Sequence, residues 1–332
     1  MSSLPNFVAP SLEELSEEFE FVRNCSYLGI PGVARFSSDV PGPCLGITVQ
    51  THGNEPSGLA ALRHFRLACM ADRLLCGSVF FVLNNVRAAE AYFRALGIED
   101  EAERNAAKMA ARFSSINMNR LPADTFDRVN DASYEVVRAH ELGPLWRRFT
   151  VALDIHTTRS KTPGMIVAIG GVEASLYRGF PADVVIRNIE NVQTGKPACA
   201  FYGDPGVTPV FGIEAGTHED PAAFEMAFSS SVALMRNLGM LPFERPSAPR
   251  QGREYRITSS VFFPNDSFLL SRAFGNFERV AAGEILAEGQ GANPILMPAD
   301  GHVVFAPPGR KHTSKLSDEV LFLSAPCVPV EI

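Results

Sequence analysis

The chain has 332 residues, of which 46% are hydrophobic and 20% charged, and this composition is typical of a globular protein with a large buried core. Its formal net charge of −7 argues against nucleic acid or an anionic membrane as a partner, because a net acidic surface repels both. No apolar run approaches the ~20 residues that a membrane-spanning helix needs, and residues 1–20 are polar and acidic, unlike a signal peptide, so we expect a cytoplasmic protein.

The first part of the chain alternates predicted strands and helices. Residues 12–15 predict a short helix and residues 33–36 a strand. The apolar, β-rich run 44–49 predicts a buried strand that ends in a polar, glycine-containing loop. Helical spacing across 57–75 and a second apolar run at 78–84 complete a strand–helix–strand unit, which predicts a parallel pair with a right-handed crossover.

The middle of the chain continues this alternation. Residues 149–155 predict another buried strand, and His156 follows it directly. The remaining predicted elements are helices at 100–113, 133–147 and 221–238 and strands at 164–170 and 207–213.

The pattern changes after Pro242. Pro246 and Pro249 lie in a polar stretch that precedes short alternating β segments separated by Gly and Asn, which predicts a small all-β module. We therefore predict two domains, an α/β domain over residues 1–243 and a β domain over residues 244–332. The predicted segments of the second are 254–257, 287–289, 294–297, 301–305 and 320–323.

A metal site is predicted where two of the buried strands end. Two residues separate His52 from Glu55 in the loop after the first strand, so an imidazole nitrogen and a carboxylate oxygen can meet at one point. His156 supplies a third ligand at the end of a separate strand. Three such ligands with one open position are typical of catalytic zinc, and the carboxyl ends of parallel strands are where open α/β sheets bind ligands.

Four motifs together resemble one family. Thr51-His52-Gly53-Asn54-Glu55, Asn119-Arg120, Asp154-Ile155-His156 and the strand-end Glu214 follow one another as in the succinylglutamate desuccinylase and aspartoacylase family, relatives of the zinc carboxypeptidases. The resemblance spans roughly residues 44 to 220. It implies a zinc-carboxypeptidase-like α/β fold, with a mixed or parallel sheet flanked by helices.

The resemblance also assigns roles to residues. It implies one Zn²⁺ per chain bound by His52, Glu55 and His156, a substrate carboxylate bound by Asn119 and Arg120, and a water attack promoted by Glu214. These roles suit the side chains, because an arginine binds a carboxylate in bidentate fashion and a glutamate facing an activated water can accept its proton. A buried Glu214 without such a function would be costly.

Three features depart from the family pattern. Asn117 stands where the family usually has an acid, and the stretch that begins at Asn85 lacks the usual proline. An insertion separates Asn85 from Asn119, so two arginines compete for the role of polarising the scissile carbonyl. Arg112 has the family-like distance to Arg120, whereas Arg94 has the family-like distance to Asn85. We favour Arg112, and expect Asn85 to contribute to substrate binding.

Other residues add weaker signals. Thr157 follows the zinc histidine and is expected to bind substrate, His218 lies close enough to Glu214 to line the pocket, and Arg159 with Lys161 gives the loop a positive rim. The segment 283–307 resembles barrel-sandwich modules related to biotinyl domains but has no lysine at the hairpin tip, so we interpret it as structural or pocket-walling. The six cysteines lack a C-x-x-C pair and are expected to be reduced.

The sequence therefore predicts a zinc-dependent amidohydrolase that acts on a small carboxylate-bearing amide of the N-acyl amino acid class, with neither nucleic acid nor membrane as a partner. Two alternatives remain open. One is a zinc carboxypeptidase acting on peptides, and the other is a catalytically inactive relative that binds ligand. A homo-oligomer with an even number of subunits is only the general expectation for such proteins.

Overall fold

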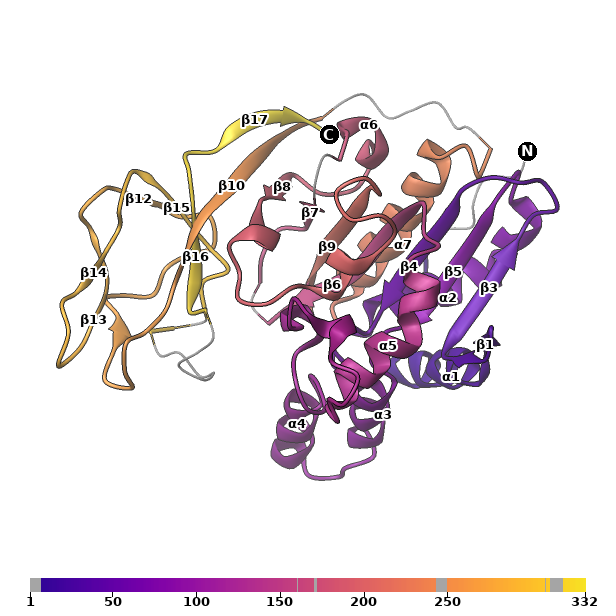
Figure 1. The fold of residues 1–332 in the computed structure, drawn as a ribbon, viewed down its shortest axis with the longest axis horizontal. Helices are drawn as coiled ribbons and strands as arrows, with labels where there is room; N and C mark the ends of the chain where they lie inside the picture. Colours follow the sequence, from indigo (N-terminus) through magenta and orange to yellow (C-terminus); the bar gives the residue numbers. More distant parts are fainter. Residues whose placement is uncertain (1–6, 160, 170–171, 243–249, 308, 311–318) are drawn as a thin grey trace.

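The structure is a computed structural model that describes residues 7–159, 161–169, 172–242, 250–307, 309–310 and 319–332 (Figure 1). Pro246, Pro249 and the predicted boundary after residue 243 lie outside the described residues. Within the described ranges, no helix combines the length and the apolar character needed to cross a bilayer.

A mixed sheet forms the centre of the molecule, as predicted. Its middle strands run parallel in the order β9-β6-β4-β5, β3 adds antiparallel to β5 at one edge, and β7 adds antiparallel to β9 on the other side, followed by β8. A short hairpin precedes this sheet. The strands so far are β1 (Ser26–Tyr27), β2 (Ile30–Pro31), β3 (Val33–Ser37), β4 (Cys44–Val49), β5 (Ser78–Leu83), β6 (Val151–Thr158), β7 (Met165–Ile169), β8 (Val184–Arg187) and β9 (Val210–Thr217).

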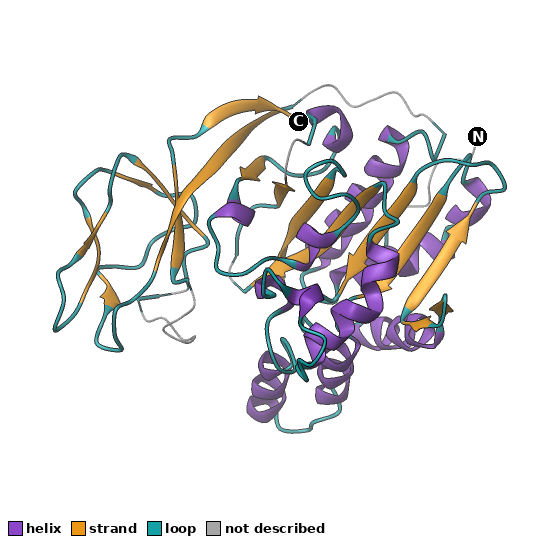
Figure 2. Cartoon of the chain, viewed as in Figure 1, coloured by secondary structure: helices purple, strands orange, loops and turns teal. Residues whose placement is uncertain are grey.

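Helices cover both faces of this sheet (Figure 2). Side chains alternate along each strand and so contribute to two cores. Phe81 of β5 belongs to the core that also contains side chains of α1, α2, α3, α6 and α7, whereas Phe80 and Val82 belong to the core that contains side chains of α5. Helix α4 buries no side chain fully. The helices are α1 (Leu12–Asn24), α2 (Ser57–Leu67), α3 (Val86–Ala95), α4 (Glu101–Ala110), α5 (Tyr134–Trp146), α6 (Ala174–Tyr177) and α7 (Pro221–Asn237).

The predicted strand–helix–strand unit is confirmed, with one difference in length. β4 and β5 pair in parallel over their full lengths, from Cys44 opposite Ser78 to Val49 opposite Leu83. The connecting helix α2 ends at Leu67 rather than near residue 75. Cys69 has a φ of 47°, a left-handed conformation that an α-helix cannot continue, and a 3₁₀ turn follows it.

The strand-rich C-terminal region continues the central sheet. The eleven-residue strand β10 pairs in parallel with β8 along its first part, where β17 flanks its other edge, and antiparallel with β16 along its second part. A separate hydrophobic cluster fills the space beyond it. Because β10 belongs to both regions, a division into two domains remains a proposal. The C-terminal strands are β10 (Gln251–Val261), β11 (Leu269–Leu270), β12 (Arg279–Val280), β13 (Ile285–Glu288), β14 (Ile295–Leu296), β15 (Gly301–Val304), β16 (Leu321–Ser324) and β17 (Val328–Glu331).

Candidate metal centre

The loop that carries the first two predicted ligands follows the carboxyl end of β4. The chain turns sharply there, with a φ of 48° at Gln50. A Cβ atom at Gly53 would overlap the backbone of Ala88, so only glycine allows the loop to pack this closely against the start of α3. His52 and Glu55 are thereby held on either side of this contact, beside the end of β6.

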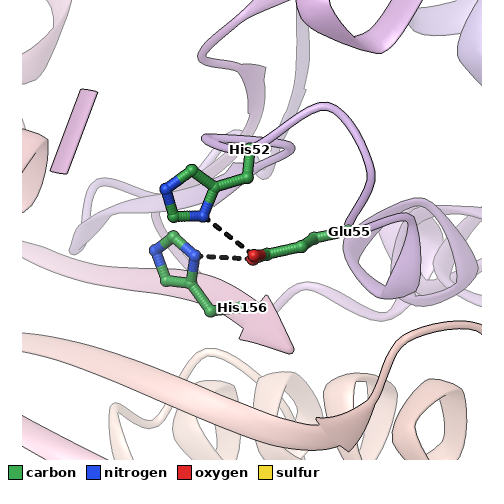
Figure 3. Close-up of side chains that lie close together, drawn as sticks. All are labelled: His52, Glu55 and His156. Atoms are coloured by element: carbon green, nitrogen blue, oxygen red, sulfur yellow. Dashed lines mark hydrogen bonds and ion pairs between the residues drawn. The ribbon is translucent and has the colours of Figure 1, made fainter. Parts of the chain in front are cut away.

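The three predicted ligands meet at one point (Figure 3). His52 Nδ1 lies 2.9 Å from Glu55 Oε1, and His156 Nδ1 lies 2.9 Å from Glu55 Oε2. One ligand atom from each residue lies within 4.8 Å of the others, and all three residues are buried. Two imidazole nitrogens and a carboxylate oxygen are a donor set that suits Zn²⁺.

The far nitrogen of each imidazole faces an oxygen atom. His52 Nε2 donates a hydrogen bond to Oδ1 of Asn117 at 2.9 Å, and His156 Nε2 lies 3.0 Å from Oδ2 of Asp154. With the proton of His52 on Nε2, its Nδ1 lone pair faces Oε1 of Glu55, whereas His156 lies between the carboxylates of Asp154 and Glu55. Such outer partners fix the tautomer that binds metal.

The charges in this group favour a metal-binding state. Burial lowers the pKa of His52 to about 4, with Arg112 adding to the effect, so its imidazole is neutral at pH 7. Burial opposes the charged form of Glu55, but the two histidines outweigh it and hold the pKa of this carboxyl well below its usual range. Burial likewise opposes protonation of His156, but the carboxylates of Asp154 and Glu55 raise its pKa well above the ordinary value. A cation binding here therefore replaces a proton on His156.

Glu214 lies beside this group on β9, where it pairs with His156 of β6 in the sheet register. Its Oε2 atom is buried and has no hydrogen-bond partner among the described residues. Burial raises the pKa of Glu214 to about 7. A carboxyl group with a pKa near neutrality can both accept and donate a proton at physiological pH.

Of the two candidate arginines, the structure brings only Arg112 to the centre. Its Nη1 atom lies 2.9 Å from Oε1 of Glu55, and its carbonyl accepts the N–H of Gly53 at 3.0 Å. Arg94 lies on the outer face of α3, where its side chain is 74% exposed and pairs with Glu90. The insertion thus folds back onto the metal loop through its C-terminal end.

Asn119 also reaches the centre, and Arg120 follows it in the chain. Nδ2 of Asn119 lies 3.3 Å from Nε2 of His156. The guanidinium of Arg120 already has partners: Nε donates to Oε2 of Glu319 at 3.1 Å and Nη1 donates to Oε1 of Gln193 at 3.1 Å. A side chain from the C-terminal region therefore contacts the predicted carboxylate-binding residue.

Asn85 is the predicted site residue that the structure keeps away from the ligands. It is fully buried, its Oδ1 caps the first turn of α3, and its Nδ2 donates to Oε1 of Glu135 at 3.0 Å. Glu135 of α5 also accepts the backbone N–H groups of Ser114, Ser115 and Ile116. No sequence signal marks Glu135, because its partners are the Asn85 side chain and three backbone N–H groups, all distant in the chain.

Thr157 lies at the centre but its polar groups are engaged. Its backbone N–H donates to Oε2 of Glu55 at 3.2 Å, and its hydroxyl lies 2.7 Å from Nδ1 of His218. Arg159 follows on the same loop, and its charge interacts with those of Glu55 and Arg112. Thr157 therefore contacts the predicted ligand Glu55, and Arg159 adds a positive charge near it.

Comparison with known proteins places the chain in a family. The family model for the succinylglutamate desuccinylase/aspartoacylase catalytic domain matches residues 41–212, more than half of the chain. The chain belongs to the succinylglutamate desuccinylase/aspartoacylase family. A search of curated proteins finds no match.

Solved structures of this family share the fold. A family protein from Shewanella amazonensis is 16% identical with a TM-score of 0.59, and the match covers 90% of this chain and 94% of that chain. Succinylglutamate desuccinylase from Vibrio parahaemolyticus is 14% identical with a TM-score of 0.62, and the match covers 98% of this chain and 100% of that chain. Murine aminoacylase 3 is 19% identical with a TM-score of 0.56, and the match covers 89% of this chain and 98% of that chain. At these identities the likeness shows the fold, and the predicted α/β architecture is confirmed.

Proposed function

We propose that this member of a hydrolase family is a zinc-dependent amidohydrolase that removes the acyl group from an N-acyl amino acid or a similar small amide with a carboxylate. The observation that carries the proposal is the convergence of His52 Nδ1, Glu55 and His156 Nδ1 on one buried point. Two outer contacts support it, because Asn117 orients the His52 ring with its Nδ1 lone pair toward that point and the Asp154 carboxylate lies next to the far nitrogen of His156.

The residues present fit a zinc ion. His52, Glu55 and His156 would hold it, which leaves room for the open position that a catalytic site needs. When bound, zinc would act as a Lewis acid, which lowers the pKa of a water molecule toward neutrality and polarises a carbonyl group.

Two side chains beside the ligands would carry the proton transfer and the charge. Glu214 accepts the proton of the attacking water and then donates it to the leaving amine. Its buried carboxyl group supports both roles, since its pKa is raised and its Oε2 atom has no hydrogen-bond partner among the described residues. Arg112 would stabilise the negative charge that develops on the carbonyl oxygen, because its guanidinium lies beside Glu55 at the centre.

Substrate choice follows from the residues around this centre. Asn119 and Arg120 would bind the substrate carboxylate, with Arg159 adding positive charge at the rim. The contact of Glu319 with Arg120 brings the C-terminal region close to the site, which favours a small substrate over a long peptide. Relatives with the same fold include an aminoacylase and a desuccinylase, and both names denote removal of an acyl group from nitrogen.

Metal content of the purified protein, measured by elemental analysis, tests the proposal first. We expect about one zinc per chain in the wild type, the stoichiometry of a mononuclear catalytic site, and none in a His52→Ala, His156→Ala double variant. A His140→Ala variant is the control, because His140 bonds to the carbonyl of Thr125 far from the ligands. Absence of zinc from the wild type, even after zinc is supplied, would contradict the proposal.

A panel of N-acetyl and N-succinyl amino acids then identifies the substrate. Release of the free amine is followed for the zinc-loaded wild type and for Glu214→Gln. We expect Glu214→Gln to keep its zinc and to lose about 10²- to 10⁴-fold in kcat, the range for a general acid–base group. Cleavage of peptides but not of N-acyl amino acids would favour a carboxypeptidase instead.

A further inference from the structure

The substrate-binding arginine of this site holds a carboxylate that belongs to the protein itself. Oε2 of Glu319 accepts the N–H of Arg120 Nε at 3.1 Å, and Oε1 of the same side chain accepts the backbone N–H of Thr194. The side chain of Glu319 is only 3% exposed, whereas that of Arg120 is 29% exposed. Glu319 comes from the segment just before β16, 199 residues away from Arg120 in the chain.

These contacts are those of a bound carboxylate ligand. One oxygen takes a charge-assisted hydrogen bond from a guanidinium and the other takes one from a backbone amide, so both ends of the group are satisfied. Arg120 and the Thr194 N–H hold the pKa of Glu319 below its usual value against the effect of burial, which keeps the group anionic.

The rest of the Arg120 guanidinium is held in place as well. Nη1 donates to the carbonyl of Asn119 at 2.8 Å and to Oε1 of Gln193 at 3.1 Å, and Nε2 of Gln193 donates to the same carbonyl at 2.9 Å. Among the described residues, Nη2 has no hydrogen-bond partner. An incoming carboxylate thus meets an arginine whose charge is already neutralised and whose Nε is occupied.

We infer that Glu319 is a specificity-determining residue, which lowers the affinity of Arg120 for a substrate carboxylate by occupying part of the same subsite. This inference rests on the proposed function, since it assumes that substrates approach Arg120. It gives the C-terminal region a role in substrate choice beyond walling the pocket, because the Glu319 carboxylate weakens the preference of this subsite for a negatively charged group.

The charge-removing variant Glu319→Gln tests the inference. Glutamine keeps the length of the side chain and an oxygen for the Thr194 N–H. The matched control is Glu254→Gln, which removes the same charge from a C-terminal glutamate paired with a different arginine, Arg187, at 2.8 Å. The probes are N-acetyl-L-leucine and N-acetyl-L-leucinamide, which differ only in the carboxylate, and binding is measured by calorimetry alongside KM in the zinc-loaded protein.

We expect Glu319→Gln to bind N-acetyl-L-leucine about five-fold more tightly than the wild type, the upper end for a partly exposed ion pair. Affinity for the leucinamide should not change, and Glu254→Gln should leave both affinities as they are. Equal affinity of Glu319→Gln and the wild type for the carboxylate, weaker binding by the variant, or no binding by either would overturn the inference.

Two further results separate this inference from the proposed function. Tighter binding by Glu319→Gln without hydrolysis by any zinc-loaded form would support the role of Glu319 and contradict the amidohydrolase. Hydrolysis by the zinc-loaded protein, with the same affinity for N-acetyl-L-leucine in Glu319→Gln and the wild type, would support the amidohydrolase and contradict the role of Glu319. If Glu319→Gln does not fold, as judged by circular dichroism, Glu319→Asp replaces it. The shorter side chain retracts the carboxylate from Arg120, so affinity should change in the same direction by a smaller factor.

Discussion

Replacing Glu135 by glutamine should destabilise the loop that carries Arg112 and Asn117. Glu135 is fully buried on α5 and accepts four N–H groups. Its Oε1 accepts from Ser114 N at 2.6 Å and from the Asn85 side chain at 3.0 Å, and its Oε2 accepts from the backbone N–H groups of residues 115 and 116, each at 3.0 Å.

The magnitude follows from this geometry. Glutamine keeps one oxygen but places an amide NH₂ against the two donors on the other side, so two charge-assisted hydrogen bonds are lost. Each is worth about 1.5–3 kcal/mol. Allowing for water that enters the loop, we expect the free energy of unfolding to fall by about 3–5 kcal/mol.

Guanidinium denaturation of the metal-free protein measures this change. The control is Glu90→Gln, which removes a surface carboxylate paired with Arg94 and should change the stability by less than about 0.5 kcal/mol. Because Arg112 lies two residues before Ser114, we also expect kcat/KM to fall in the zinc-loaded Glu135→Gln variant. A loss of stability below about 1 kcal/mol would refute the reasoning, since it would mean that the loop does not depend on these hydrogen bonds.

Three more predictions concern the centre itself. The pKa of Glu214 is raised to about 7 in the folded protein, so the stability that its protonated form contributes is full below the pKa of the unfolded chain and is lost as pH rises through 7. Metal-free Glu214→Gln should therefore be more stable than the wild type at pH 8 and equally stable at pH 4. Thermal unfolding at the two pH values measures this difference. Gly53→Ala should lower the free energy of unfolding by more than about 3 kcal/mol, because the new Cβ atom would overlap backbone atoms. In the same denaturation assay, the control Gly97→Ala should change this free energy by less than about 1 kcal/mol, because the nearest atom to its new Cβ lies 3.6 Å away. Asp154→Asn should weaken zinc binding about 10- to 100-fold in a chelator competition, because the charge behind His156 is lost; an unchanged affinity would show that the ring needs no carboxylate partner.

Local patterns in the sequence predicted most of the central fold. Apolar runs such as 44–49 and 78–84 gave β4 and β5 with nearly correct bounds, because a strand buried on both faces needs continuous apolar residues. The end of α2 was missed, since the left-handed backbone at Cys69 has no glycine or asparagine to announce it.

The residues of the site also differ in how far the sequence predicts them. His52, Glu55 and His156 could be predicted because ligand chemistry and strand ends mark them. Asp154 and His156 are two residues apart and so lie on one face of the strand, a spacing that marks Asp154 as an imidazole partner.

The sequence by itself determined the element types, the family and the residues able to bind a metal, because each depends on a local run or a short motif. Only the tertiary structure brought Arg112 rather than Arg94 to Glu55, placed Asn85 against Glu135, extended the sheet through β10 and brought Glu319 onto Arg120. These contacts join segments that are distant in the chain, and they depend on how the insertion and the C-terminal region pack. No periodicity or spacing within either segment encodes that packing.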